Sequence, residues 1–290
     1  MIYLLLVSFI WAFSFGLVKG NLNSVDSNFV AFCRLAIATL ALLPWLRLKH
    51  LSKLFLMKLA FTGAIQYGIM YLLLFYAFHY LQAYEVALFT ILTPLYVTII
   101  QNLINRSFSY KALLLTLLAI TGTIIIKYAE LSSNNLISGF LIMQGANLCF
   151  AFGQVYYKHI LNRLHIRDIQ VFGLMFGAAA IVTGLVTVYY SGRLFHELNS
   201  TEIYTIIYLG LIASGLGFFL WNYGARMVDT TSLAIFNDLK IPLAVAVSIV
   251  FFNESADLLR LISGGLIVGM ALYLNEKFLN KPLVERRQNP

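Results

Sequence analysis

The sequence predicts an all-α integral membrane protein, with ten transmembrane helices arranged as two inverted five-helix repeats around a central cavity. The first observation is composition: 60% of the 290 residues are hydrophobic and only 11% are charged, whereas a soluble domain is about 25% charged. The second is a series of apolar runs, and the third is a likeness between the two halves of the chain. Because the bilayer core offers the backbone no water, spans of this composition are expected to be helical.

Polar residues divide the chain into apolar runs, most of them close to the roughly 20 residues that a helix needs to cross a bilayer. The two shortest divisions, at residues 81–84 and 226–230, predict tight antiparallel hairpins. The ten predicted spans are 2–19, 29–46, 59–80, 84–104, 112–129, 137–157, 169–190, 203–223, 231–251 and 259–276.

Basic residues are distributed unevenly between the predicted loops. With a cytoplasmic N-terminus, fourteen Lys and Arg residues fall on the cytoplasmic side and four on the other, namely Lys19, Lys127, Arg193 and Arg260. This bias follows the positive-inside rule. It predicts a protein of the bacterial inner (plasma) membrane with both termini in the cytoplasm. The loops thereby explain the net charge of +8, and no nucleic-acid partner is predicted.

The two halves of the chain share a pattern. Trp11–Lys19 is similar to Phe150–Lys158 at an offset of 139 residues, and Pro94 corresponds to Pro242. Each half holds five predicted spans, and because five is odd the halves are expected to have opposite orientations. Inverted repeats of this kind are typical of transporters, whose substrate site lies where the halves meet. The predicted units are a first repeat at 1–129, a linker at 130–136, a second repeat at 137–276 and a cytoplasmic tail at 277–290.

Short motifs occur along the chain in a fixed order. They are Trp11-Ala12-x-Ser14-Phe15 with Lys19, Arg34 with Ala36 and Ala38, Tyr76-Ala77 with Pro94, Gly210–Gly217, Pro242 with Glu254, and Gly264-Gly265 with Gly269. In their order and spacing the chain resembles the ten-helix EamA type of the drug/metabolite transporter (DMT) superfamily. The resemblance implies a pseudosymmetric bundle with spans one, three, four, six, eight and nine around the cavity and spans five and ten at the periphery. It also implies secondary-active (non-ATP) transport of small metabolites or drugs.

Span nine departs from the family pattern, since Asn237, Asp238 and Lys240 precede Pro242 where the family is mostly apolar. A charged group inside a bilayer costs about 2.5–3.5 kcal/mol on insertion scales, so it is expected to face protein or water. Asp238 and Lys240 are therefore predicted to bind a polar substrate or to couple transport to protons, and a structural ion pair or a snorkelling lysine is the alternative. The pair fits a zwitterion. The predicted function is export of amino acids or related compounds by alternating access, and the alternative is import of a charged nucleotide-like metabolite such as S-adenosylmethionine.

Further polar and aromatic residues within the spans complete the predicted site. Amide side chains are unfavourable in lipid and are expected to face inward, where hydrogen bonding between helices is the alternative role. Aromatic side chains form a wall for a flat or cationic substrate, or they pack in the core. The predicted substrate-binding residues are Trp11, Ser14, Phe15, Tyr71, Asn147, Gln154, Trp221, Asn222, Asn237, Asp238 and Lys240.

Charged or titratable groups near span ends have other predicted roles. Glu85 and His79 are candidates for coupling or gating, and an ordinary position at a helix end is the alternative for both. Arg34 lies about one turn inside span two. It is expected to snorkel to the outer surface or to bond loop carbonyls.

The chain contains no motif that is typical of another function class. His196-Glu197 continues as Leu-Asn-Ser and so does not complete HExxH, and no phosphate-binding or cofactor motif occurs. No enzyme activity, cofactor or metal is predicted. The rivals from other classes are a membrane enzyme acting on lipid-linked substrates and a channel or receptor. The predicted partners are a small-molecule substrate and the lipid bilayer, and proton coupling is left open. Glycine pairs such as Gly173/Gly177 and Gly265/Gly269 predict close helix packing within a monomer or homodimer.

Overall fold

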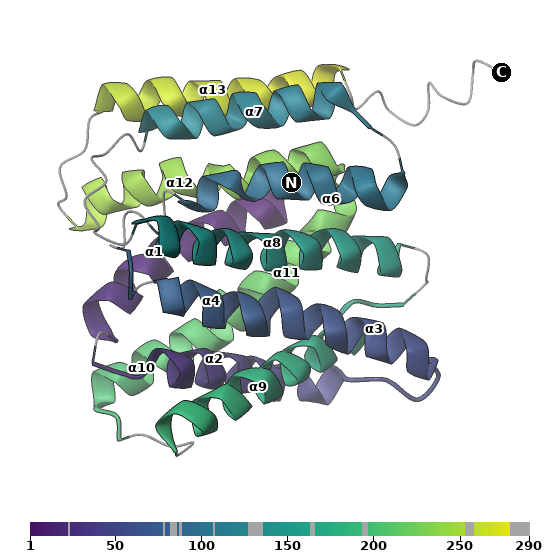
Figure 1. The fold of residues 1–290 in the computed structure, drawn as a ribbon, viewed down its shortest axis with the longest axis vertical. Coiled ribbons are helices and arrows are strands. Elements are labelled where there is room, and N and C mark those ends of the chain that lie inside the picture. The colour runs from purple at the N-terminus through teal and green to yellow at the C-terminus, as the bar shows by residue number, and fades with distance from the viewer. Residues whose placement is uncertain are drawn as a thin grey trace.

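The computed structural model describes residues 1–22, 24–77, 79–81, 86, 89–106, 108–126, 136–162, 166–192, 197–252 and 258–278. Within these residues the chain is helical, without strands, and its helices fall into ten consecutive segments (Figure 1). The first half holds α1 (Ile2–Asn21), α2 (Ser27–Leu42), α3 (Lys53–Gly63) with α4 (Met70–Ala77), α6 (Thr93–Asn105) and α7 (Tyr110–Ile126). The second half holds α8 (Leu136–Leu161), α9 (Ile169–Ser191), α10 (Ser200–Tyr208) with α11 (Gly217–Met227), α12 (Thr230–Phe252) and α13 (Leu258–Phe278).

The described helices have the length and the surface of a membrane protein. Five helical stretches are long and apolar enough to cross a bilayer, and shorter apolar helices lie at 2–14, 110–122 and 262–275. Large apolar side chains such as Leu40, Ile181 and Leu266 point outward and are about two-thirds exposed. Apolar surface of this kind is suited to a bilayer, where lipid chains rather than water contact the exposed side chains.

Most predicted span boundaries agree with the helices to within a few residues. Span three, predicted to start at residue 59, starts earlier, because α3 already begins at Lys53. The hydroxyl of Ser52 accepts a hydrogen bond from the N–H of Phe55 and so caps the helix. Lys53 and Lys58 interrupt the apolar run without interrupting the helix. In span four, a short 3-10 turn at Thr90–Leu92 precedes α6, and most of residues 82–88 lie outside the described part.

Two other helix starts follow from local hydrogen bonds. The carboxylate of Asp26 accepts from the N–H of Phe29 at 2.8 Å at the start of α2. Asn199 and Glu202 form a reciprocal capping box at the start of α10. At the far end of α9, Gly192 has a φ of +66°, a left-handed conformation that glycine adopts without strain.

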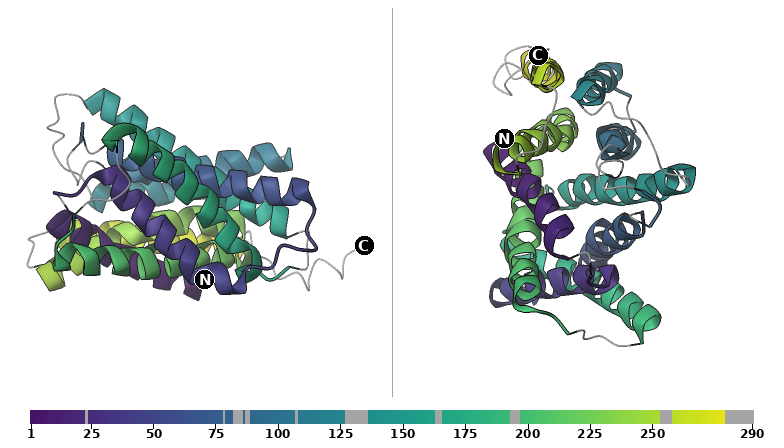
Figure 2. Two further views of the ribbon diagram at one scale, coloured as in Figure 1. Left: turned by 90° about the horizontal axis from the view of Figure 1, so that it is seen from below. Right: turned by 90° about the vertical axis from the view of Figure 1, so that its left-hand side faces the viewer.

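Helix contacts occur in pairs that are related by exchange of the two halves. α1 packs against α12 and α11, as α8 packs against α6 and α4. α2 packs against the turn that joins α10 to α11, and α9 packs against the turn that joins α3 to α4. α7 and α13 pack on each other at one end of the molecule, while α2 and α9 lie at the opposite end (Figures 1 and 2). The position of α7 and α13 agrees with the peripheral placement implied for spans five and ten.

The predicted glycine contacts are only partly present. A Cβ at Gly173 or Gly177 would lie 3.5–3.6 Å from Leu42, Leu46 and Thr39, an ordinary packing distance against the second span. Gly265 and Gly269 do not pack closely within the chain, since a Cβ there would meet nothing within 4 Å, and a contact of these glycines in a homodimer stays a prediction. On α13 it is Gly264 and Ile267 that face Gly122 of α7, where a Cβ would lie 2.8 Å from the carbonyl oxygen of Gly264 and 3.0 Å from the side chain of Ile267.

Candidate functional site

The centre of the molecule is built on two π-helical turns at equivalent places in the two halves. One turn, Ala64–Ile69, joins α3 to α4, and the other, Leu209–Leu216, joins α10 to α11. In the second turn the N–H of Gly217 bonds to the carbonyl of Ile212, five residues back. The carbonyl of Ala213 accepts a hydrogen bond from the indole N–H of Trp11 at 2.9 Å. Single π turns often occur at functional sites because they redirect side chains and free backbone groups.

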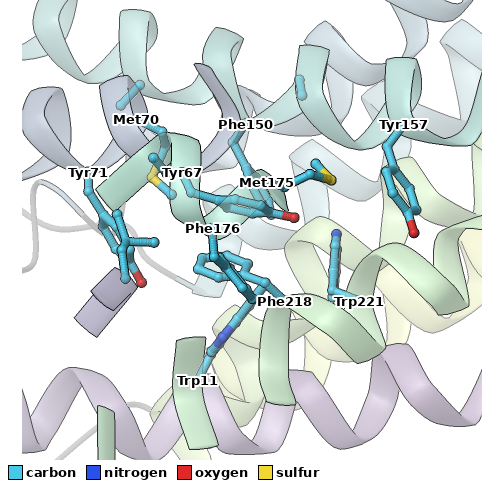
Figure 3. Packing of buried hydrophobic residues seen from close by; sticks show 14 of the residues in the cluster. Trp11, Tyr67, Met70, Tyr71, Phe150, Tyr157, Met175, Phe176, Phe218 and Trp221 are labelled. Carbon is cyan, nitrogen blue, oxygen red and sulfur yellow. The ribbon is translucent and has the colours of Figure 1, made fainter. Parts of the chain in front are cut away.

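Aromatic rings from both halves fill the space between these turns (Figure 3). The ring of Trp11 lies 4.9 Å from that of Trp221 and 5.1 Å from that of Phe218, between centroids. Phe150 of α8 contacts the same three rings. Tyr71 continues the cluster from Phe218 toward the second span. The site therefore has a continuous aromatic wall contributed by spans one, three, six and eight.

A first group of buried amides adjoins this wall. The indole N–H of Trp221 donates to Oε1 of Gln154 at 2.8 Å. The amide of Asn237 donates to the same oxygen at 3.3 Å and to the carbonyl of Leu233 at 2.8 Å. All three side chains are fully buried. The structure thus brings together three predicted site residues, from spans six, eight and nine.

A second group of buried amides is centred on Asn222, the residue after Trp221. Gln66 and Asn222 exchange two hydrogen bonds, at 2.9 and 3.0 Å, and the amide of Asn222 also donates to the hydroxyl of Tyr67 at 2.8 Å. These three side chains are fully buried as well. Gln66 and Tyr67 belong to the first π turn, so the pair joins the two halves of the chain.

Arg34 does not lie where the sequence places it. The expectation that it snorkels to the outer surface or bonds loop carbonyls is wrong, because the side chain is only 6% exposed. Its Nε donates to the hydroxyl of Ser214 at 3.0 Å, and its guanidinium lies 4.7 Å above the ring of Tyr71. The hydroxyl groups of Tyr71 and Ser214 are 3.3 Å apart. Packing of α2 against the second π turn directs the arginine inward.

Other predicted residues lie elsewhere. Asn147 is buried, but it donates to the carbonyl of Phe89 at 2.6 Å and to Gln144 at 3.1 Å, two turns of α8 away from Gln154. Ser14 bonds back to the carbonyl of Trp11 within α1. His79 is exposed beyond the end of α4, as its alternative interpretation predicts, with its ring at the edge of Tyr76.

Of the charged pair in span nine, the structure describes the side chain of Asp238 only. Asp238 is fully buried on α12. The side chains of Lys240 and Phe15 lie outside the described part of the structure, and so does the whole of Glu85. Binding roles for these residues stay predictions.

Sequence reasoning missed four residues of the centre: Arg34, Gln66, Tyr67 and Ser214. Gln66 carries a signal that was available, because it is a lone amide in an apolar run, like Gln154. Arg34 carries such a signal too, as a charge inside an apolar span, whereas Ser214 carries none. Their meeting depends on contact between α2 and a π turn far along the chain.

An ion pair joins two helices at one end of the bundle. The guanidinium of Arg226, at the end of α11, pairs with the carboxylate of Asp168, just before α9. Tyr157 of α8 donates to the same carboxylate at 2.6 Å, and Arg226 also donates to Asn162 at 3.0 Å. These contacts tie three helices together at the end that the charge bias predicts to be cytoplasmic.

Comparison with known proteins gives one family. A model of the EamA-like transporter family matches the chain twice, over residues 1–128 and 137–275. A protein of Pseudomonas aeruginosa named "Probable biotin transporter" is 36% identical over 276 residues, which are 94% of this chain and 96% of that protein. The "Biotin transporter" proteins of Escherichia coli K12 and Salmonella typhimurium are 31% identical over 281 residues, 96% of this chain and 94% of theirs. A crystal structure at 13% identity superposes with a TM-score of 0.76 over 94% of this chain and 95% of that chain, so the fold is shared.

Proposed function

The chain belongs to the EamA-like transporter family, and from this premise we propose that it carries biotin across the membrane. The observation that supports the proposal most strongly is similarity over nearly the whole length of both halves to proteins named as biotin transporters. Similarity on this scale includes the segments that form the aromatic and amide centre. The chain is a membrane transporter of this family, and the substrate is the proposed part.

The chemistry of the centre fits such a substrate. Biotin joins a carboxylate, on a short alkyl chain, to a compact fused ring system that carries a cyclic urea. A urea needs both donors and acceptors, and the amides of Gln154, Asn222 and Asn237 offer both. The rings of Trp11 and Trp221 offer apolar surface for the fused rings. Sites for small molecules commonly combine an apolar lining with a few placed polar groups in this way.

The sequence predicts an amino acid or S-adenosylmethionine as the substrate, and the relatives do not support either. Their names state that they transport biotin. That prediction depended on Asp238 and Lys240 as partners for a zwitterion. Biotin has no cationic group, so Asp238 has no substrate charge to meet under the present proposal. The outward direction of transport stays a prediction from the sequence, and coupling to protons stays open.

We further propose alternating access as the mechanism. The centre is formed by residues of both halves, with Trp11 and Gln66 from the first and Gln154 and Trp221 from the second. A movement of one half against the other would break the hydrogen bonds between Gln66 and Asn222 and open the centre to one side. Inverted repeats provide two equivalent movements of this kind, one for each side of the membrane.

Labelled biotin in bacterial cells tests the proposal. The cells can neither make biotin nor take it up by a transporter of their own, and they carry either this chain or an empty vector. We expect faster entry of labelled biotin, or faster loss from preloaded cells if transport is outward, only in cells with the chain. Unlabelled leucine or S-adenosylmethionine should not compete. Biotin fluxes equal to those of the empty vector, with the protein present in the membrane, would reject biotin as the substrate.

A further inference from the structure

Arg34 presents hydrogen-bond donors that the protein does not use. A guanidinium has five N–H donors and is always charged. Only Nε donates, to Ser214 at 3.0 Å; in the described part of the chain, the two terminal amino groups make no hydrogen bond. The side chain is 6% exposed and lies within an apolar helix, Ser27–Trp45, that is long enough to cross the bilayer. A charge in such a place is costly unless an opposite charge accompanies it.

Among the described residues no carboxylate forms an ion pair with Arg34. Its neighbours are the neutral hydroxyl of Ser214 and the face of Tyr71, 4.7 Å from the guanidinium carbon. Arg226, by comparison, is paired with Asp168 and also bonds Asn162. Arg34 therefore differs from an arginine that is neutralised within the structure.

The surroundings keep the unused donors oriented. The guanidinium carbon lies 4.7 Å from the centre of the Tyr71 ring, a cation–π contact. Ser214 fixes the Nε edge, and the 3.3 Å contact between the hydroxyls of Ser214 and Tyr71 joins the two neighbours. The terminal amino groups are a suitable pair of donors for a carboxylate, which arginine binds with two parallel hydrogen bonds.

We propose that Arg34, oriented by Ser214 and Tyr71, binds the carboxylate of the transported substrate. The inference rests on the proposed function in naming biotin, but its chemistry applies to any small carboxylate. Ser214 and Trp221 are seven residues apart on one continuous helical segment, which is about 10 Å along the axis. Arg34 thus lies at one end of the aromatic wall and the amides of Gln154 and Asn237 near the other. An elongated molecule with a carboxylate at one end and a urea at the other fits this order.

The test compares biotin with biotinamide, which has the same rings and chain but no charge. Dissociation constants are measured by titration of the purified protein in detergent. Loss of one partner of a buried, hydrogen-bonded charge pair weakens binding by about 30-fold or more. We expect biotinamide to bind the wild type at least about 30-fold more weakly than biotin does.

Variants locate the effect at Arg34. Arg34→Gln should bind biotin as weakly as the wild type binds biotinamide, while its affinity for biotinamide stays unchanged. Arg34→Lys, which keeps the charge, should restore part of the preference for biotin. Arg47→Gln is the matched control, because Arg47 is an exposed arginine near the end of the same span, and it should behave as the wild type.

The outcomes separate the two proposals. If the wild type binds biotin and biotinamide equally well, or if folded Arg34→Gln keeps the preference for biotin, the carboxylate role is wrong although biotin is a substrate. If the wild type binds neither, biotin is wrong as the substrate, and leucine is compared with leucinamide in the same experiment. A preference for leucine that Arg34→Gln loses would then support the carboxylate role. Absence of any such preference would overturn it.

Discussion

Trp221 joins the two halves of the chain at the level of single residues. It is fully buried, its ring contacts Trp11 of the first half, and its indole N–H donates to Gln154 of the second. The contributions of the Trp221 ring and of its indole N–H can be separated by a substitution. A phenylalanine keeps most of the apolar surface and removes the donor, which leaves Gln154 with less support for its orientation.

We predict that Trp221→Phe weakens biotin binding about tenfold, which corresponds to about 1.4 kcal/mol, the usual size of one buried hydrogen bond. The measurement is the dissociation constant of purified protein. Trp45→Phe is the control, because Trp45 is 50% exposed, and its affinity should equal that of the wild type. Unchanged affinity in Trp221→Phe would mean that the Trp221–Gln154 hydrogen bond plays no part in binding.

Residue by residue, the sequence predicts the centre only in part. Trp11, Gln154, Trp221 and Asn237 are recognisable because a polar or large aromatic group in an apolar span has a strong reason to face inward. Arg34 was assigned wrongly by the same reasoning, since a long side chain one turn inside a helix has two ways to reach a partner. Only the packing of α2 on a distant turn decides between them.

At the scale of elements, the π turns depend on close approach between spans of opposite halves. A Cβ added at Gly63, just before the first π turn, would lie 2.2 Å from the carbonyl oxygen of Met175 on α9. Gly210, in the second π turn, faces Ile37 of α2, where a Cβ would lie 2.8 Å from its side chain. Glycine at these two positions allows each π turn to contact the second span of the other half.

We predict that Gly63→Ala lowers the free energy of unfolding by about 3 kcal/mol, the upper range for overpacking, because the clash is with backbone that cannot move aside. The loss should appear as a lower unfolding temperature in detergent. Gly265→Ala is the control, since a Cβ there meets nothing within 4 Å; it should leave stability unchanged or raise it slightly, because alanine favours the helix more than glycine does. Equal unfolding temperatures for the two variants would contradict the close approach of α3 and α9.

The sequence predicts the helices well and the π turns not at all. Apolar runs set the length of each span, and local caps at Ser52 and Asn199 set some of the starts. A π turn adds about one residue to a helix and leaves the apolar run intact, so it has no compositional signal. Its position follows from contacts between segments far apart in the chain, such as α9 with Ala64–Ile69.

For the whole molecule, the ion pair of Arg226 and Asp168 ties the helices together at one end of the bundle. The carboxylate of Asp168 is 5% exposed and the side chain of Arg226 is 18% exposed, so the pair is largely shielded from water. Removing one partner of such a pair leaves the other charge buried, which costs more than the pair itself contributes.

We predict that Arg226→Ala lowers the free energy of unfolding by about 3 kcal/mol, and that the double variant Arg226→Ala/Asp168→Asn recovers part of the loss. Unfolding in detergent measures both. Arg167→Ala is the control, because Arg167 is exposed and directly precedes Asp168. A double variant less stable than Arg226→Ala would indicate that the Asp168 carboxylate stabilises this end through Tyr157 rather than through the arginine.

Exchange of biotin by the purified protein tests the central claim most directly. Liposomes that contain the protein are loaded with unlabelled biotin or with unlabelled leucine and then placed in a trace of labelled biotin. If the protein is a carrier of biotin, unlabelled biotin that leaves the liposomes is exchanged for labelled biotin, and the label accumulates inside for a time against its own gradient. We predict such accumulation only in liposomes loaded with biotin. No accumulation of labelled biotin, together with accumulation of labelled leucine in liposomes loaded with leucine, would contradict the account and favour an amino-acid transporter.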